Sequence, residues 1–531
     1  MAMNPRLLRP TSGNDSPASI PGLALWLDAA AADALYQNSD GTVPATAPGD
    51  PVGYWRDRSG NGRHATQSTA ASRPVVGSQN GRKALTFDGT NDFMSADAAA
   101  AVFAGTDTPW TVLAAIDMNS TANSSPWAAS RNDAFAGRYL ARVVSNTWNH
   151  LFTDDSGVNK AIATGTPVSL DPSVLTVIKQ GATASISVLG ATVLSGADAS
   201  GTATPTTFTV GAHNNLGGVT SYSSLNALEV LAYSRALSTA ERRKVEVYLA
   251  RRWGITLAPQ VSNAEAQDWI NRVYANGGTV STSTASAVST FCDAIDAAGI
   301  RDRFYRLNLF CGDNLNAALV PLYRGPTFGG TTYGNATDTN NGPFVSGDYS
   351  LASGLWPGAS NSSKYLNTGY KANTLAASNT HMGLGLLATN TINSSFRTGL
   401  GAFSGSSNSL EVILHSAVSG ARCASFTRFG TATDTAGDVV FNASLTAGSI
   451  VAAWPTVYRD GVATGTDATT SQDYPSAHDM FVFANSSGGV TPINYSNPRL
   501  GYYSIGATMT SAQALAYSTA MSAFYSAIGR S

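Results

Sequence analysis

The carboxylates are the residues whose spacing tests most directly for hydrolytic chemistry. Cleaving a glycosidic bond usually takes two carboxylates about 5–10 Å apart, which on one face of a strand means a spacing of two or four residues. The chain has five glutamates, and no two of them show that spacing: Glu229, Glu241, Glu246, Glu265 and Glu411. The sequence therefore disfavours a glycosidase with paired glutamates.

Nucleophilic and metal-dependent catalysis also lack their usual patterns. The segment GAFSG at residues 401–405 places its serine one position too late for a nucleophile elbow. The six histidines are scattered and form neither an HxH nor an HExxH pattern. The cysteines stand far apart, so we expect buried free thiols, with one Cys292–Cys311 bridge as the alternative and Cys423 left single. We therefore expect a protein that is not an enzyme.

Two glycine-rich turns carry oxygen-bearing side chains at short spacing. The segment DRSGNG holds Asp57 and Asn61, and the segment FDGTND holds Asp88 and Asp92. Such side chains commonly bond to the nearby backbone in tight turns, where glycine supplies the positive φ. The same oxygens are also ligands that calcium prefers, although calcium needs about 6–8 of them. Both a structural turn and a calcium site stay open, and we expect no other cofactor.

Several aromatic residues stand in loop-like contexts. Exposed tyrosine and tryptophan rings stack on the apolar faces of sugars, so these residues are candidates for glycan binding. The alternative is that each ring is half-buried at a strand end. The candidates are Trp127, Trp148, Tyr222, Tyr333, Trp356 and Tyr474.

The charge pattern excludes other kinds of partner. Charged residues make up 12% of the chain and the net charge is −2, with no basic stripe, so we expect no nucleic-acid binding. No run approaches about 20 apolar residues, so we expect no membrane span. Residues 1–20 contain Arg6 and Arg9 among Pro, Ser and Asn, and we interpret them as an extended arm that tethers the chain to a partner.

The elements that must position these residues are mostly short strands separated by Gly, Ser, Thr and Asn turns. Residues 21–258 end in a helix that the capping box Ser238 to Glu241 starts. Residues 259–310 show helical spacing, and residues 311–531 return to short strands. This second region also ends in a capping box, Thr510 to Gln513, followed by an apolar helix.

The two regions share a further echo. The segment VIKQG at residues 177–181 and the segment VYRDG at residues 457–461 both have the form of a strand followed by a turn. We therefore predict an all-β protein with two tandem β-sandwiches of one architecture, each closed by a short terminal helix, with a small helical insert between them.

The ordered motifs of the first region resemble the laminin-G-like, concanavalin-A-like jelly-roll superfamily. They are GLALWLD at 22–28, the DRSGNG and FDGTND turns, and YSRALSTAE at 233–241. The second region resembles it less, through KYLNTGY at 364–370 and VYRDG, and its opening motif is missing. The resemblance implies a jelly-roll fold. The arm and the tandem domains are also similar to tail and surface proteins of bacteriophages.

The sequence thus predicts a bacteriophage virion structural surface protein, on a tail fibre, a baseplate or a capsid. We expect it to contact other virion proteins through the arm, to contact host surface glycans, to form homo-oligomers and to be assembled in the host cytoplasm. The alternative is a carbohydrate-binding, lectin-like adhesin that is not part of a virion. The chain has no heptad pattern to enforce trimers, so an oligomer would form through the arm or the β-domain faces.

Overall fold

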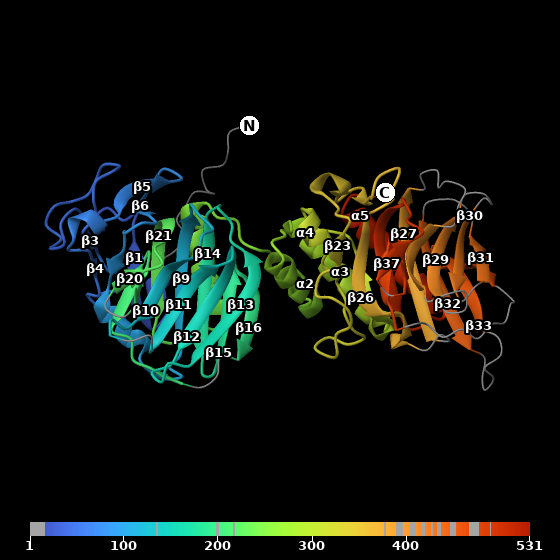
Figure 1. Ribbon diagram of the computed structural model, residues 1–531, viewed down its shortest axis with the longest axis horizontal. Coiled ribbons are helices and arrows are strands. Elements are labelled where there is room, and N and C mark those ends of the chain that lie inside the picture. Colours follow the sequence, from blue (N-terminus) through green and yellow to red (C-terminus); the bar gives the residue numbers. More distant parts are fainter. Residues whose placement is uncertain are drawn as a thin grey trace. The chain divides into compact units, whose positions relative to one another are not determined.

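The computed structural model describes residues 16–530 except 134–135, 198–200, 216–217, 376–378, 389–396, 404–408, 416–419, 426–427, 433–436, 446–452, 467–476 and 489. The chain divides into two compact units, residues 1–258 and residues 259–531. Each unit contains an eight-stranded and a nine-stranded sheet, in which the strands are almost all antiparallel (Figure 1). The chain is therefore an all-β protein of two β-sandwiches, as predicted.

The eight-stranded sheet of the first unit has the order β16-β15-β14-β9-β21-β6-β5, with β1 also paired to β21. The last strand of the unit thus lies inside the sheet. The strands are β1 (Leu23–Asp28), β5 (Val75–Gln79), β6 (Arg82–Asp88), β9 (Trp110–Met118), β14 (Ser173–Gln180), β15 (Thr183–Val188), β16 (Ala191–Ala197) and β21 (Ser224–Tyr233).

The nine-stranded sheet of this unit has the order β13-β12-β11-β10-β18-β7-β4-β3-β2. Its strands are β2 (Leu35–Tyr36), β3 (Tyr54–Trp55), β4 (Ala65–Thr66), β7 (Met94–Ser95), β10 (Ser124–Ser130), β11 (Arg138–Val144), β12 (Thr147–Thr153), β13 (Asn159–Pro167) and β18 (Thr207–Val210). Two small pairs flank it: β8 (Gly105–Thr106) with β17 (Thr202–Ala203), and β19 (His213–Asn215) with β20 (Gly218–Thr220).

Aromatic side chains join the two sheets of the first unit. Trp110 of β9 contacts Trp127 of β10 with ring centroids 5.9 Å apart, and Tyr139 of β11 at 5.2 Å. Phe103, at the end of a 3-10 helix, stacks on Phe208 at 5.5 Å. All five side chains are buried. Since each aromatic ring buries about 150–250 Å², these contacts supply much of the apolar burial between the sheets.

The helix α1 (Thr239–Trp253) covers the outer face of the eight-stranded sheet. It begins with the predicted capping box, in which the side chains of Ser238 and Glu241 each accept a hydrogen bond from the other residue's backbone N–H. It ends at Gly254, which has φ +70°, a conformation that glycine adopts without strain. Val245 and Leu249 of the helix pack in one buried cluster with Leu231 of β21.

The eight-stranded sheet of the second unit has the order β24-β25-β38-β27-β32-β33-β34, with β22 paired to β38. Its strands are β22 (Phe304–Asn308), β24 (Tyr349–Ser350), β25 (Gly354–Leu355), β27 (Asn379–Ala388), β32 (Gly437–Leu445), β33 (Ala453–Arg459), β34 (Val462–Thr466) and β38 (Arg499–Gly506). As in the first unit, the last strand lies inside the sheet.

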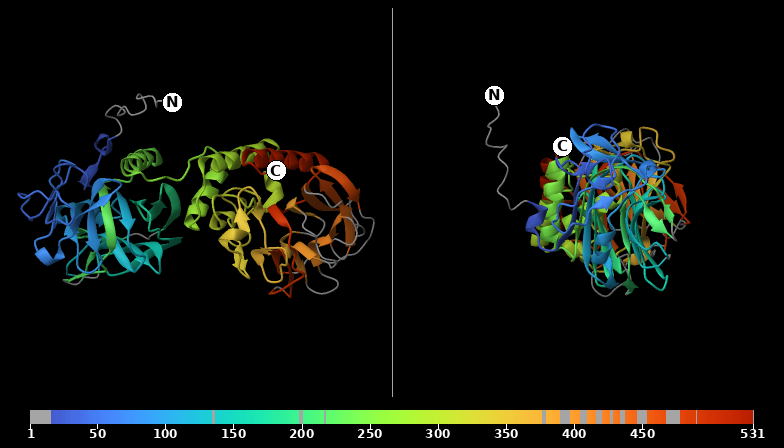
Figure 2. Two further views of the ribbon diagram at one scale, coloured as in Figure 1. Left: turned by 90° about the horizontal axis from the view of Figure 1, so that it is seen from above. Right: turned by 90° about the vertical axis from the view of Figure 1, so that its left-hand side faces the viewer.

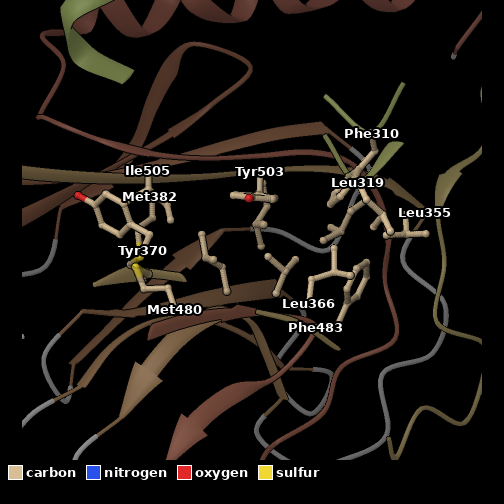
Figure 3. Packing of buried hydrophobic residues seen from close by; sticks show 14 of the residues in the cluster. Phe310, Leu319, Leu355, Leu366, Tyr370, Met382, Met480, Phe483, Tyr503 and Ile505 are labelled. Carbon is tan, nitrogen blue, oxygen red and sulfur yellow. The ribbon is translucent and has the colours of Figure 1, made fainter. Parts of the chain in front are cut away.

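The nine-stranded sheet of the second unit has the order β23-β26-β35-β28-β29-β30-β31, with β36 paired to β28 and β37. Its strands are β23 (Thr339–Asn341), β26 (Tyr365–Lys371), β28 (Arg397–Phe403), β29 (Ser409–His415), β30 (Gly420–Ser425), β31 (Arg428–Ala432), β35 (Asp479–Val482), β36 (Asn485–Ser487) and β37 (Thr491–Ile493). Between the sheets, Met382, Tyr503 and Ile505 face Leu366, Tyr370 and Met480 (Figure 3).

The helices of the second unit are α2 (Ala264–Ala275), α3 (Thr282–Ala297), α4 (Leu315–Ala318) and α5 (Ser511–Ala527). The predicted capping box of Thr510 and Gln513 starts α5. The helices α3 and α5 lie side by side (Figure 2), with the rings of Phe291 and Phe524 5.8 Å apart. The segment 259–310 is therefore part of the second unit, and its last strand, β22, opens the second sandwich.

The described end of the N-terminal arm packs on the first unit rather than extending from it. Residues Pro17–Ser19 form a 3-10 turn, and the hydroxyl of Tyr233 donates to the carbonyl of Pro17 at 3.1 Å. Ile20 is buried in the cluster under α1. Arg6 and Arg9 lie outside the described residues. None of the helices in the described part of the chain is both long and apolar enough to cross a membrane.

Candidate functional site

The outward face of the nine-stranded sheet in the first unit carries a row of polar side chains. Successive side chains of a strand point to opposite faces, so Trp127, Tyr139 and His150 point inward toward Trp110. Their strand neighbours point outward. We call the outward-pointing polar side chains at this end of the sheet the arginine face: Arg138, Arg142, Asn149, Thr153 and Thr207.

The side chains of the arginine face hold one another in place. Arg142 Nε donates to Asn149 Oδ1 at 2.9 Å, and Arg138 Nε donates to Thr153 Oγ1 at 3.2 Å. Both pairs stand directly opposite each other on β11 and β12. Arg142 is half-buried and forms no ion pair within the described part of the chain. A partly dehydrated guanidinium without a carboxylate leaves N–H donors for a ligand.

The electrostatics of this face favour an electron-rich ligand. Burial lowers the pKa of both Arg138 and Arg142, and for Arg138 the neighbouring charge of Arg142 adds to the effect. Burial, together with these two arginines, lowers the pKa of His213 to about 4, so its imidazole is neutral at pH 7. A carboxylate would offset the local positive charge, and hydroxyl oxygens would accept hydrogen bonds from the guanidinium groups.

The hairpin of β19 and β20 borders the arginine face. Asn214 Nδ2 donates to Thr207 Oγ1 at 3.0 Å, and His213 Nδ1 lies 3.1 Å from Ser125 Oγ. The predicted candidate Tyr222 follows this hairpin and is half-buried. The hairpin thus brings one of the predicted aromatic residues close to β10, through the bond from Ser125 N to Ser221 O at 2.9 Å.

A second group, which we call the tyrosine edge, lies at the β2 end of the same sheet. It consists of Tyr36, Tyr54, Arg56 and His64, all of them half-buried. Tyr36 and Tyr54 are paired across β2 and β3 with ring centroids 5.6 Å apart, and His64 lies 5.0 Å from Tyr54. Arg56 lies over the Tyr36 ring at 5.2 Å and pairs with Asp33 at 2.7 Å.

The strand register places the two groups on one face. Tyr54 is paired with Thr66, Thr66 with Ser95, Ser95 with Thr209, and Thr209 with Ala128. Directly paired residues point to the same side of a sheet. The sequence did not predict the tyrosine edge, because Tyr36 and Tyr54 are 18 positions apart and meet only through the pairing of two short strands.

Two of the predicted aromatic candidates were wrong. Trp127 and Trp148 are only 1% and 2% exposed, and they lie within β10 and β12 rather than in loops. A ring that packs between the sheets has no free face for a sugar, because its surface already contacts core side chains. Trp127, for example, packs against Trp110 and Phe208.

The remaining candidates lie in the second unit. Tyr333 packs against the second core, with its ring 5.4 Å from Tyr305. Trp356 is half-buried, and Arg499 lies over its ring at 4.3 Å. Tyr474 lies outside the described residues. The described candidates of the second unit therefore pack against their own unit and do not gather into one site.

The predicted calcium ligands lie in two hydrogen-bonded turns. Asp57 Oδ1 accepts from the backbone N–H groups of Trp26 at 2.9 Å and Ser59 at 2.8 Å, and Asn61 Nδ2 donates to the carbonyl of Leu23 at 3.1 Å. This turn therefore ties residues 57–62 to β1.

The second turn is similar in its chemistry. Asp88 Oδ1 accepts from Thr90 N at 2.7 Å, and Asp92 Oδ2 accepts from Asp88 N at 3.0 Å. Burial raises the pKa of Asp92 to about 6. The described residues contain no group of three or more His, Cys, Asp or Glu side chains that could hold a metal ion. The turns thus have a structural role, and calcium binding stays a prediction.

A pair of carboxylates that the sequence did not predict lies beneath α1. Asp28 of β1 and Glu229 of β21 stand opposite each other and are 1% and 0% exposed. Trp26 Nε1 and Trp253 Nε1 donate to Glu229 at 2.6 and 3.0 Å, and Arg252 Nη2 donates to Asp28 at 2.6 Å. Burial, together with the charge of Asp28, raises the pKa of Glu229 to about 7.

The described cysteines match the prediction of buried free thiols. Cys292 and Cys311 are buried and unpaired with each other. Burial raises the pKa of both thiols to about 12, so neither is a thiolate at pH 7. The side chain of Cys423 lies outside the described residues.

Comparisons with known proteins give only distant likenesses. No family model matches the chain, and no curated protein matches it. A solved structure of NanB sialidase from Streptococcus pneumoniae is similar at 16% identity and TM-score 0.26, covering 29% of this chain and 26% of that one. The chain thus spans about a quarter of the length of this sialidase.

Two smaller binding domains are also similar. The CBM40 domain of a Ruminococcus gnavus IT-sialidase, solved with sialyllactose, matches at 11% identity and TM-score 0.25, over 33% of this chain and 96% of that one. The receptor-binding domain of botulinum neurotoxin D matches at 10% identity and TM-score 0.32, over 46% and 58%. At these scores the likenesses carry no argument about a site.

Proposed function

We propose that the chain is a glycan-binding surface protein without enzymatic activity, and that its first unit binds sugars on the outward face of the nine-stranded sheet. The observation that carries this proposal is the arrangement of Arg142 and Asn149. Arg142 bonds to Asn149 at 2.9 Å and has no ion-pair partner among the described residues, so its remaining N–H groups can donate to a ligand.

The composition of the face fits a sugar ligand. Sugars present hydroxyl groups at their rim and apolar C–H groups on their ring faces, so they need polar side chains beside an accessible aromatic ring. The half-buried guanidinium of Arg142 is the accessible group of the arginine face, whose other four side chains are buried. The tyrosine edge supplies two half-buried rings on the same side of the sheet. One extended chain of sugars would contact both groups.

The absence of catalysis is part of the proposal. Asp28 and Glu229 are one pair of opposed carboxylates in the first unit, and α1, Trp26 and Trp253 cover them. A glycosidase needs its two carboxylates open to the substrate. At 1% and 0% exposure these two instead serve to fix β1 and α1 on the sheet.

The proposal also covers where the protein is located. We propose a virion surface as its site, with the adhesin outside a virion as the alternative, and both use the same binding face. This choice is supported by the sequence resemblance alone. Mass spectrometry of purified phage particles from the source organism distinguishes the two: recovery of the chain at stoichiometric amounts is expected, and its absence would favour the adhesin.

A glycan array with the full chain tests the binding function. We expect at least one glycan class to bind, and Arg142→Gln and Tyr54→Ala each to weaken that binding by tenfold or more. Arg82→Gln is the matched control, because Arg82 is exposed and lies on β6 of the other sheet. An empty array, or undiminished binding by both variants, would contradict the proposal.

A further inference from the structure

The second unit contains a polar cleft of about 300 Å³ that the proposed function does not use. Its walls come from α2 and from the loop at residues 322–332, with Arg301 between them. The volume is at the lower end of the range for pockets that hold small molecules and is large enough for a single sugar ring.

The charges that line the cleft are unbalanced. Arg301 forms a two-pronged ion pair with Glu265 at 2.6 and 2.7 Å, and Arg272 pairs with Asp268 at 2.7 Å. Arg324 also lines the cleft, and within the described residues its guanidinium has no ion pair or hydrogen bond. The cleft therefore holds one arginine more than it holds carboxylates.

The two paired arginines fix the backbone that carries Arg324. Arg272 donates to the carbonyls of Pro321 at 2.6 Å and Leu322 at 2.9 Å, and Arg301 donates to the carbonyl of Gly325 at 2.8 Å. The position of Arg324 is thus set by bonds on both sides. A preformed donor binds an anion with less loss of conformational freedom than a mobile one.

Arg324 is half-buried, which matters for its affinity for an anion. Burial, together with the nearby charge of Arg272, lowers the pKa of Arg324 to about 10. The guanidinium is therefore still protonated at pH 7 but poorly solvated. A carboxylate that pairs with it would replace missing water and form the two parallel N–H···O bonds that guanidinium groups favour.

An aromatic ring stands beside this charge. Phe328 lines the same cleft and is 57% exposed, so much of its ring surface is accessible to a ligand. It lies in a tight turn in which Gly330 N donates to Thr327 O at 3.3 Å and Gly329 has φ +72°. The positive φ at Gly329 suits a glycine, so the turn presents the ring in a defined place.

We propose that this cleft binds a carboxylated sugar, with the carboxylate on Arg324, an apolar ring face on Phe328, and hydroxyl groups near Thr327 and Thr332. A simple inorganic anion would use Arg324 but would gain nothing from the exposed ring. A neutral sugar would use the ring but would leave the arginine unpaired. The carboxylated sugar uses both features, and the site is independent of the face proposed for the first unit.

Ligand-observed NMR and calorimetry on the full chain test the site. The probes are glucuronate and N-acetylneuraminate, with glucose and acetate as controls at matched ionic strength. We expect at least one acidic sugar to bind at least tenfold more tightly than glucose or acetate. We expect Arg324→Gln to weaken binding tenfold or more and Phe328→Ser to weaken it several-fold, with saturation transfer from aromatic protons to the sugar ring lost in Phe328→Ser.

The matched control is Lys371→Gln, because Lys371 is an exposed cation on β26 of the same unit. This variant should leave the binding of the acidic sugar unchanged, which separates the loss of any one positive charge from the loss of Arg324. Failure of both acids to bind, equal binding of acetate, or undiminished binding by Arg324→Gln would overturn the proposal. If Arg324→Gln does not fold, undiminished binding by the surface variant Phe328→Ser would overturn it equally.

Discussion

In both units the first strand of the sandwich pairs with the last strand, but the buried polar side chains at this strand pair differ. In the first unit, β1 on β21 brings together two carboxylates, Asp28 and Glu229, under Arg252 of α1. In the second unit, β22 on β38 instead carries Arg306, which pairs with Asp338 at 2.6 Å. Both strand pairs thus carry a buried polar contact, although the residues that make the contact differ.

The difference explains why the opening motif of the second unit is missing from its sequence. Arg306 Nε donates to the hydroxyl of Tyr503 at 2.8 Å, and Asn308 Nδ2 donates to Asp338 at 2.8 Å, so this network lies within the sandwich rather than beneath a helix. The sequence of β22 therefore does not resemble that of β1, because its polar side chains match different partners.

The hairpins offer a second comparison between the units. The sheet orders match β15 and β16 with β33 and β34, since each pair forms the end of its sheet. The turn at Leu189 and Gly190 therefore corresponds to the turn at Asp460 and Gly461, and all four have positive φ. The predicted correspondence between residues 177–181 and 457–461 was wrong. Residues 177–181 lead from β14 to β15, which is one hairpin earlier than the equivalent of residues 457–461.

Removing the carboxylate of Asp338 should have the largest effect. Asp338→Ala leaves Arg306, which is 0% exposed, as an unpaired buried charge, and we expect a loss of about 3–5 kcal/mol in the unfolding free energy of the second unit. Urea unfolding, monitored by hydrogen exchange in each unit, measures this loss of free energy. Asp302→Ala, which removes a carboxylate that is 54% exposed from its pair with Arg303, is the control and should cost at most about 1 kcal/mol. Equal costs for the two variants would contradict the difference in burial.

Acidification should act on the second unit through His381. Burial lowers the pKa of this fully buried imidazole to about 4, below its usual 6.5, so the unfolded chain binds the proton more tightly. The stability that depends on neutral His381 is therefore complete above about pH 6.5 and is lost as the pH falls toward 4. We expect a loss of about 2–3 kcal/mol, and His381→Gln should flatten that part of the profile.

In the first unit Glu229 should act in the opposite direction. Its pKa is raised to about 7 in the folded state, so the folded chain binds the proton more tightly and stability decreases as the pH rises from 4.5 to 7. The gain from Glu229 on acidification offsets part of the loss from the buried, neutral His150 and His213.

Hydrogen exchange at pH 7 and pH 5 that showed identical profiles for His381→Gln and the wild type would contradict the role of His381.

The equivalent turn glycines should differ by a smaller amount. A Cβ at Gly461 would lie 2.7 Å from the backbone Cα of Leu515 in α5, whereas a Cβ at Gly190 would meet the movable end of Arg243 at 2.3 Å. Both alanine variants incur about 1–2 kcal/mol for the positive φ. Because only Gly461→Ala displaces helix backbone, we expect it to cost about 1 kcal/mol more than Gly190→Ala. Thermal unfolding of the two variants measures the difference, and a larger cost for Gly190→Ala would reverse this interpretation.

Local features were predictable from the sequence, and contacts across strands were not. The capping boxes at Ser238 and Thr510 start helices as expected, because they depend on residues three positions apart. The burial of Trp127 and the pairing of Tyr36 with Tyr54 depend on which strands become neighbours. Asp28 and Glu229 are separated by most of the first unit, so no spacing rule could have brought them together.

The placement of β21 has a consequence for how the chain is made. This strand pairs with β1, β6 and β9. During translation these three strands therefore lack their pairing strand until the residues from 224 onward have been synthesised. Until then the sheet has a gap with unpaired backbone groups on both sides, which is the kind of edge that joins other chains. A fragment that ends before β21 should therefore aggregate during translation. The same holds for β38 in the second unit, so we expect each unit to fold only when its last strand is included.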